Sequence, residues 1–200
     1  MKKRLAVLIS NMGTGTNLQA IIDGIKTKKI NARIISVISD TAKAEGLKRA
    51  RRNKLPIEIC PEKEKLLPLL KNLDIDYVCL AGWKQIILQE VINAFPNRIL
   101  NTHPGLIPDK INETVKNPDN TIGLWNRKKM TDKAIQGFLD NRSTYAGCSN
   151  HFLSNDFDFG KVLGRCFEKI KKNDTIKTLY SRLKLKENKL YIKSLSKLCK

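Results

Sequence analysis

The sequence lacks long hydrophobic runs, paired cysteines and, apart from two residues, histidine. No apolar stretch approaches the roughly 20 residues that a membrane-spanning helix needs. The N-terminal MKKRLAVLIS places three basic residues before an apolar stretch, but the polar NMGTGTN follows with no small-residue cleavage site. We therefore expect a first strand rather than a signal peptide, in a cytoplasmic protein that does not contact membranes.

The five cysteines form no CxxC pair and show no ligand-like spacing with histidine. Small buried thiols are the better interpretation, because free cysteine is among the most buried residue types. We expect no metal site.

Acidic residues are also few: 19 Asp and Glu stand against 38 Lys and Arg, a formal net charge of +19. Such an excess suits nucleic acid or phosphorylated ligands. The lysines are nevertheless scattered along helix-like segments without interleaved aromatics, so a solvated surface is the alternative. Charge alone does not indicate a nucleic-acid partner.

The first half of the chain alternates apolar strands with helical patterns, which predicts a parallel sheet covered on both faces. Strands are predicted at 4–10, 32–39, 56–60, 76–82 and 98–103. Helices are predicted between them, two of them over 41–53 and 86–95. The fold class is therefore α/β, with a doubly wound, mostly parallel central sheet.

The second half begins with a polar stretch, 109–129, that carries Pro118 and Gly123 and predicts a long loop. A helix is predicted from Thr131, then two strands over 145–154 and 161–170. A terminal helix follows, with Asp174 as its N-cap. No linker is visible, so we predict a single domain over 1–200, with 109–129 as a lid-like insertion.

The turn after the first strand carries candidate phosphate-binding residues. Two glycines let a backbone approach a ligand closely, and a helix N-terminus supplies donors to an anion. These candidates are Gly13, Gly15, Thr16 and Asn17. A plain tight turn is the alternative, because the motif is neither GxGxxG nor a Walker loop.

Asn101 and His103 lie two residues apart at the end of a predicted strand, so both side chains leave the same face. An amide donor beside an imidazole suits the stabilisation of an oxyanion, although a strand-end histidine is often structural. A carboxylate from the loop NDFDFG could orient the imidazole. Asp156 and Asp158 are both candidates for it, or for an Asx turn.

Glu187 falls on the apolar stripe of the terminal helix, with Lys184 three residues before it. An inward-facing carboxylate is costly unless it is paired or binds something. The two residues form either a salt bridge or a ligand-binding pair.

Four segments, LISNMGTGTNLQAII, VCLAGWKQIIL, LNTHPGLIP and GCSNHFLSNDFDFG, resemble in this order the phosphoribosylglycinamide formyltransferase family. These are folate-dependent enzymes of purine biosynthesis with a Rossmann-like fold. The resemblance implies that Asn101, His103 and Asp158, rather than Asp156, are the catalytic residues. It assigns the ribonucleotide to the first turn and to Lys184 and Glu187. It assigns the folate to the segment Trp83, Lys84, Gln85, Ile86 and Ile87, where Trp83 either stacks on the pterin or packs in the core.

The sequence departs from the family at the first loop, which is two residues longer through Asn11 and Met12. It departs again at Phe159–Lys161, which replaces a glycine-proline, and at Trp125, which stands where the family often has histidine.

The resemblance implies formyl transfer from 10-formyltetrahydrofolate to the amine of glycinamide ribonucleotide, without a metal. Alternatives are another amine acceptor, such as a sugar nucleotide or methionyl-tRNA, or a binding protein without catalysis. Small-molecule substrates and a monomer or homodimer are expected.

Overall fold

The computed structural model describes residues 1–10 and 14–200. The chain divides into two compact units, Met1–Asn101 with Tyr191–Lys200, and Thr102–Leu190. Seven strands follow one another in a single sheet in the order β3-β2-β1-β4-β5-β6-β7. Two elements, β5 (Ile99–His103) and α6 (Ile176–Leu198), contribute residues to both units. The predicted α/β class with a mostly parallel sheet is confirmed.

The strands of the first unit are apolar because helices cover both of their faces. Besides β5 they are β1 (Lys3–Ile9), β2 (Ala32–Ser39), β3 (Ile57–Ile59) and β4 (Tyr77–Leu80). Their pairings with one another are parallel, β1 with β2 and β4, β2 with β3, and β4 with β5. Parallel strands direct their carboxyl ends to one edge, and this edge is where ligands bind in such folds.

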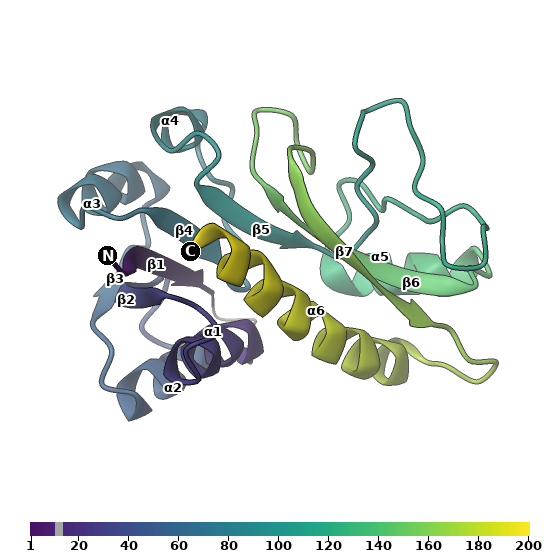
Figure 1. Ribbon diagram of the computed structural model, residues 1–200, viewed down its shortest axis with the longest axis horizontal. Helices are drawn as coiled ribbons and strands as arrows, with labels where there is room; N and C mark the ends of the chain where they lie inside the picture. The colour runs from purple at the N-terminus through teal and green to yellow at the C-terminus, as the bar shows by residue number, and fades with distance from the viewer. Residues whose placement is uncertain (11–13) are drawn as a thin grey trace. The chain divides into compact units, whose positions relative to one another are not determined.

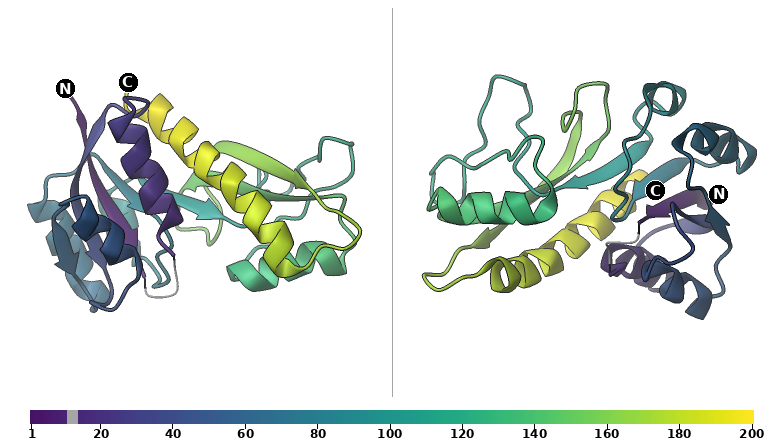
Figure 2. Two further views of the ribbon diagram at one scale, coloured as in Figure 1. Left: turned by 90° about the horizontal axis from the view of Figure 1, so that it is seen from below. Right: turned by 180° about the vertical axis from the view of Figure 1, so that it is seen from behind.

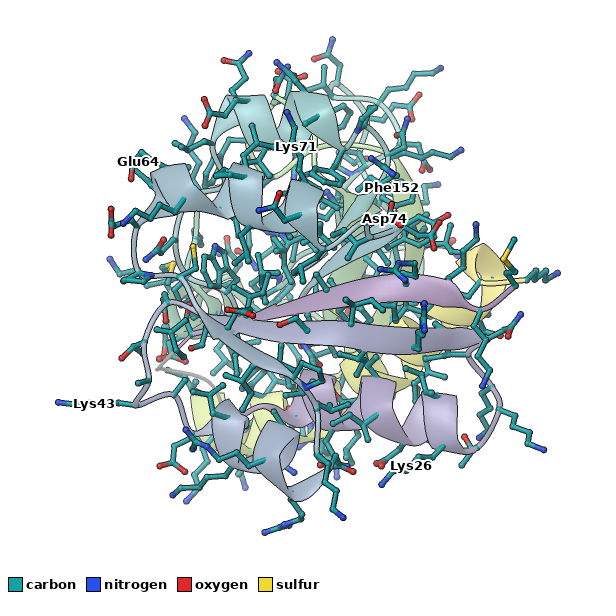
Figure 3. The ribbon with its side chains drawn as sticks, turned by 90° about the vertical axis from the view of Figure 1, so that its left-hand side faces the viewer. Lys26, Lys43, Glu64, Lys71, Asp74 and Phe152 are labelled. Atoms are coloured by element: carbon teal, nitrogen blue, oxygen red, sulfur yellow. The ribbon has the colours of Figure 1, made fainter. Side chains whose placement is uncertain are left out.

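The helices of the first unit are α1 (Thr16–Lys26), α2 (Gly46–Arg52), α3 (Leu66–Asn72) and α4 (Gln89–Ala94), with a 3-10 turn at Lys63–Lys65 before α3. Figure 3 shows α1, marked by Lys26, on one side of the strands and α3, marked by Lys71, on the other. This two-sided cover is the arrangement that the near-continuous apolar strands predict.

Two predicted helices begin later than expected. The helix predicted over 41–53 begins at Gly46, because the residues after β2 form a turn in which the hydroxyl of Ser39 donates to the carbonyl of Thr41 at 2.8 Å. The helix predicted over 86–95 begins at Gln89. The residues before it are held in irregular conformation, with the N–H of Lys84 donating to Ser10 Oγ at 2.9 Å.

The second unit contains the antiparallel pair β6 (Tyr145–Phe152) and β7 (Val162–Lys169), with α5 (Thr131–Asp140) and most of α6. Its core joins Ile135 and Phe138 of α5, Ala146 of β6, and Leu179 and Leu183 of α6; Figure 2 shows these elements from two further sides. The segment between β5 and α5 is the long loop that the sequence predicts, apart from one isolated bridge between Lys116 and Ile122.

The predicted N-cap of α6 is wrong by one residue. The hydroxyl of Thr175, not the carboxylate of Asp174, accepts the N–H of Thr178 at 3.3 Å. The two carboxylate oxygens of Asp174 instead accept hydrogen bonds from the guanidinium of Arg182, at 2.8 Å and 2.7 Å. Although α6 has 23 residues, neither it nor another helix in the described ranges is long and apolar enough to cross a membrane.

Candidate active site

His103 ends β5, and its side chain is only 2% exposed. Its Nε2 atom lies 2.7 Å from the backbone oxygen of Trp125. A carbonyl oxygen only accepts hydrogen bonds, so Nε2 carries the proton in this contact. The second nitrogen, Nδ1, faces Asp158.

Asp158 lies on the loop between β6 and β7, and its Oδ1 atom is 3.4 Å from Nδ1 of His103. Its other oxygen accepts the backbone N–H of Lys128 at 2.7 Å. Burial would raise the pKa of this carboxyl, but the hydrogen bond and charge of His103, with the N–H of Lys128, hold the pKa below its ordinary value. The group therefore faces the imidazole as a carboxylate. A φ of 52° at Asp158 places it in the left-handed region, which Asp tolerates better than most residues.

Asp156, the other candidate on this loop, is exposed and takes part in the turn through its backbone. Its N–H donates to Ser154 Oγ at 3.2 Å, and its carbonyl accepts the N–H of Phe159 at 3.1 Å. The structure brings Asp158, and not Asp156, to His103.

Residues at the end of the 109–129 segment form hydrogen bonds with the loop that carries Asp158. Trp125 donates from Nε1 to the carbonyl of Asp158 at 3.0 Å, and its ring lies 5.8 Å from that of Phe159. The guanidinium of Arg127 lies 4.9 Å from the Trp125 ring centre and donates to the carbonyl of Phe157 at 3.0 Å. Figure 1 shows the connection between β5 and α5 and the connection between β6 and β7 extending on the same side of the strands.

Two further residues shape this site, and neither has a strong signal in the sequence. A Cβ atom on Gly105 would overlap the Trp125 carbonyl oxygen and lie 2.8 Å from Nε2 of His103, so only glycine leaves room for that contact. His151 is fully buried on β6. Burial, followed by the nearby charge of His103, lowers the pKa of His151 to about 4, so its ring is neutral near pH 7.

Asn101, the third predicted catalytic residue, lies on β5 two residues before His103 and is partly buried. It is the last residue of the first unit, whereas His103 and Asp158 belong to the second. The alternation of a strand gives Asn101 and His103 the same side of β5.

The first turn keeps part of its predicted geometry. Gly15 precedes α1 with a φ of 70°, and a Cβ atom there would lie 2.8 Å from Cα of Gly46. Thr16 and Asn17 open the helix, and the hydroxyl of Thr16 is buried without a hydrogen-bond partner among the described residues. Arg49 of α2 donates to the carbonyl of Thr14 at 3.0 Å. Gly13, with Asn11 and Met12, lies outside the described residues.

The predicted folate segment runs irregularly between β4 and α4. Ile86 is 68% exposed, whereas Ile87 is buried. The side chain of Gln85 donates to the carbonyl of Pro61 at 3.0 Å. Trp83 is partly buried, and its Nε1 atom has no hydrogen-bond partner in the described part of the chain. The exposed side chain of Ile86 offers an apolar surface on which a flat heterocycle can lie.

Lys184 and Glu187 form a partly buried salt bridge on α6, with Nζ 2.6 Å from Oε1 and side chains 21% and 6% exposed. Burial would lower the pKa of Lys184, but Glu187 and Tyr180 raise it above its ordinary value. The structure therefore shows the pair; a ligand role for it stays a prediction. Within residues 1–10 and 14–200, no three His, Cys, Asp or Glu side chains gather so as to hold a metal ion.

Comparisons with known proteins agree on one family. The formyl transferase family model matches residues 3–110. A chloroplastic phosphoribosylglycinamide formyltransferase of Arabidopsis thaliana is 29% identical over 208 residues, which cover 99% of this chain and 66% of that protein. A trifunctional purine biosynthetic protein, adenosine-3, of Homo sapiens is 32% identical over 199 residues, which cover 95% of this chain and 18% of that protein. The chain thus spans less than two thirds of the length of these curated relatives.

Among solved structures, glycinamide ribonucleotide transformylase 1 of Symbiobacterium toebii is similar over 98% of this chain and 86% of its own. The TM-score is 0.80 and the sequence identity 32%.

Proposed function

Because the chain belongs to the formyl transferase family, we propose that it transfers a formyl group from 10-formyltetrahydrofolate to the amine of glycinamide ribonucleotide. The relatives named for phosphoribosylglycinamide formyltransferase and the similar transformylase structure support this choice of acceptor. The folate is a co-substrate in this proposal. The chemistry rests on side chains of the protein.

The observation that carries the proposal is the placement of the His103 imidazole between two acceptors. Nε2 lies 2.7 Å from the Trp125 carbonyl, and Nδ1 lies 3.4 Å from the Asp158 carboxylate. Only the imidazolium donates from both nitrogens. A cation held in a buried site is suited to stabilise negative charge as it develops on a formyl oxygen.

In the proposed reaction, the lone pair of the neutral amine attacks the formyl carbon, and the carbonyl π electrons move to the oxygen. Asn101 and protonated His103 stabilise this oxyanion. As the intermediate collapses, the bond from carbon to the folate nitrogen breaks. The amine loses one proton and the leaving nitrogen gains one, which a water ordered by Asp158 can relay.

The remaining predicted residues are assigned to binding. We infer that Gly15, Thr16 and Asn17, with Gly13, hold the phosphate, because a helix N-terminus attracts anions. Lys184 and Glu187 are assigned to the ribonucleotide, and the segment Trp83–Ile87 to the pteridine. The net charge of +19 favours such anionic substrates.

The wider setting of this activity is inferred from the same family. We propose a cytoplasmic enzyme that acts as a single domain, a monomer or homodimer, on small molecules. The segment 109–129 is proposed as a lid over the reacting groups.

The test is a turnover assay that offers three acceptors with the same formyl donor: glycinamide ribonucleotide, an amino-sugar nucleotide and charged initiator tRNA. Turnover confined to glycinamide ribonucleotide is expected. Formylation of only one of the other amines would replace the acceptor but keep the class of reaction. Absence of transfer to all three, with folate still bound, would overturn the proposal in favour of a binding protein.

A further inference from the structure

Two of the five cysteines face each other across the β6–β7 pair, on the second unit. Cys148 and Cys166 are directly opposite in the antiparallel register, and their Sγ atoms are 3.0 Å apart. Both are free thiols. Opposite residues in an antiparallel pair bring their Cβ atoms within about 4.5–5.5 Å, slightly more than the roughly 3.5–4.5 Å of a disulfide. The strands therefore need only a small approach to join the two sulfurs.

The two thiols are not equivalent. The hydrogen bond from Cys148 lowers the pKa of Cys166, and the charge of Lys186 acts in the same direction, against burial and Glu187. The same hydrogen bond, followed by burial, raises the pKa of Cys148. A lowered pKa increases the thiolate fraction of Cys166, and the thiolate is the nucleophilic form of cysteine.

Access to solvent also makes Cys166 the more reactive of the two thiols. Cys166 is partly exposed on β7, the last strand of the sheet, whereas Cys148 is fully buried behind it. An accessible low-pKa thiol next to a second thiol is the arrangement of a redox-sensitive pair. Burial instead raises the pKa of Cys79 and of Cys199, so these thiols lack the same reactivity.

We propose that Cys148 and Cys166 form a dithiol site that is reversibly oxidised to a disulfide, with Cys166 as the attacking and Cys148 as the resolving residue. No other residue or activity is needed for this modification, so it stands independently of formyl transfer.

The chemistry balances with a hydroperoxide as oxidant. The Cys166 thiolate attacks one peroxide oxygen, the O–O bond breaks, and Cys166 becomes a sulfenic acid. The hydroxide that leaves takes up the proton that the Cys166 thiol had released and becomes water. The Cys148 sulfur then attacks that of Cys166 and expels a second water, so two thiols and one hydrogen peroxide give one disulfide and two waters. A small dithiol reverses the reaction by exchange. The Cβ separation strains such a cross-strand bond and keeps it reducible.

The experiment uses the full chain, treated with hydrogen peroxide, quenched in acid, alkylated and digested with trypsin. Cys148 lies in the tryptic peptide 143–161 and Cys166 in 166–169, so the expected product is these two peptides linked. Two of the five thiols should be lost and then recovered with dithiothreitol. Five alkylatable thiols after treatment, or a first linkage through other cysteines, would overturn the proposal.

Matched variants assign the two roles. Cys60→Ser, which removes a thiol from the first unit, should leave the linked peptides unchanged. In Cys148→Ser, Cys166 should accumulate as a sulfenic acid that dimedone traps. In Cys166→Ser, Cys148 should stay reduced, and its oxidation at the rate of the unmodified protein would contradict the assigned order.

Discussion

The backbone oxygen of Trp125 lies 2.7 Å from Nε2 of His103 and accepts its hydrogen bond. The other ring nitrogen, Nδ1, faces Asp158. The same residue donates from its indole to the carbonyl of Asp158 at 3.0 Å. One residue of the 109–129 segment therefore contacts both His103 and Asp158. This segment contributes to the geometry of the site even though it carries neither of these two side chains.

Asp158→Asn is expected to lower kcat by at least about 10²-fold, because the amide keeps the shape of the carboxylate but loses the charge that stabilises the imidazolium. KM for both substrates should change by less than about threefold. Steady-state kinetics with glycinamide ribonucleotide and 10-formyltetrahydrofolate measure both effects.

Asp156→Asn is the matched control, because Asp156 lies two residues away on the same loop and is exposed. Its kcat should stay near that of the unmodified chain. Near-normal turnover in the Asp158 variant, or equal losses in both, would contradict the role given to Asp158.

Gly105→Ala is expected to separate His103 from its backbone acceptor. The added Cβ would overlap the Trp125 oxygen, so the 109–129 segment must shift. Overpacking of this kind costs about 1–3 kcal/mol in the free energy of unfolding. A fall in kcat larger than that stability loss can explain, measured well below the unfolding temperature, is the expected result.

Gly164→Ala, on β7, controls for the substitution itself. Its Cβ would meet only the end of the Leu190 side chain, at 2.9 Å, which can move aside. A small effect on stability and none on kcat is expected. If the two variants behave alike, the Trp125 contact has no part in the reaction.

The parts of this fold that the sequence predicts well are those governed by local pattern. The apolar runs that became β1 and β2 have no other stable place than a sheet covered on both faces. Helix starts were predicted less well, because contacts from distant residues decide them. Ser10 holds Lys84 outside α4, and Arg182 takes the carboxylate of Asp174 that local pattern assigns to the cap of α6.

In the candidate site, too, some features are visible in the sequence and others depend on contacts in the folded chain. His103 and Asp158 carry functional groups that a sequence displays, and the structure brings them together. Trp125 contacts His103 through a backbone carbonyl, which every residue has, so no side-chain pattern can reveal that contact. His151 lies in an apolar strand, where a histidine is easily interpreted as part of the core. Its burial, followed by the charge of His103, lowers its pKa to about 4 in the folded chain, and the sequence does not display either cause.

Lys184→Met is expected to lower the free energy of unfolding by about 3 kcal/mol, because it leaves the Glu187 carboxylate buried without its cation. Lys110→Met is the control, since Lys110 and Glu113 have the same spacing at 3.2 Å but side chains 82% and 48% exposed. That pair should contribute less than about 1 kcal/mol. Urea unfolding of both variants measures the difference, and equal losses would contradict it.

The double variant Lys184→Met with Glu187→Leu tests whether the pair also binds substrate. Replacing both charges by apolar side chains should recover most of the lost stability. If the pair contacts the ribonucleotide, KM for that substrate stays raised while KM for the folate is unchanged. An unchanged KM for the ribonucleotide in a stable double variant would show that the pair is structural alone.

His151 predicts a loss of stability in mild acid. Its pKa is about 4 in the folded chain and about 6.5 when unfolded, so the unfolded state binds the extra proton between these values. The contribution is therefore complete above about pH 6.5 and falls, by up to about 1.4 kcal/mol per pH unit, as the pH drops toward 4. Unfolding free energies measured between pH 7 and pH 4.5 should show this slope.

His151→Gln removes the titrating group and should flatten the dependence on pH between about 6.5 and 4.5. Titration of Asp158 does not produce the same loss of stability in this pH range. Because its folded pKa is held below the ordinary value, its contribution is present above the unfolded pKa and is lost only in stronger acid. An equal slope in the variant and the unmodified chain over this range would mean that His151 is not held neutral by the fold.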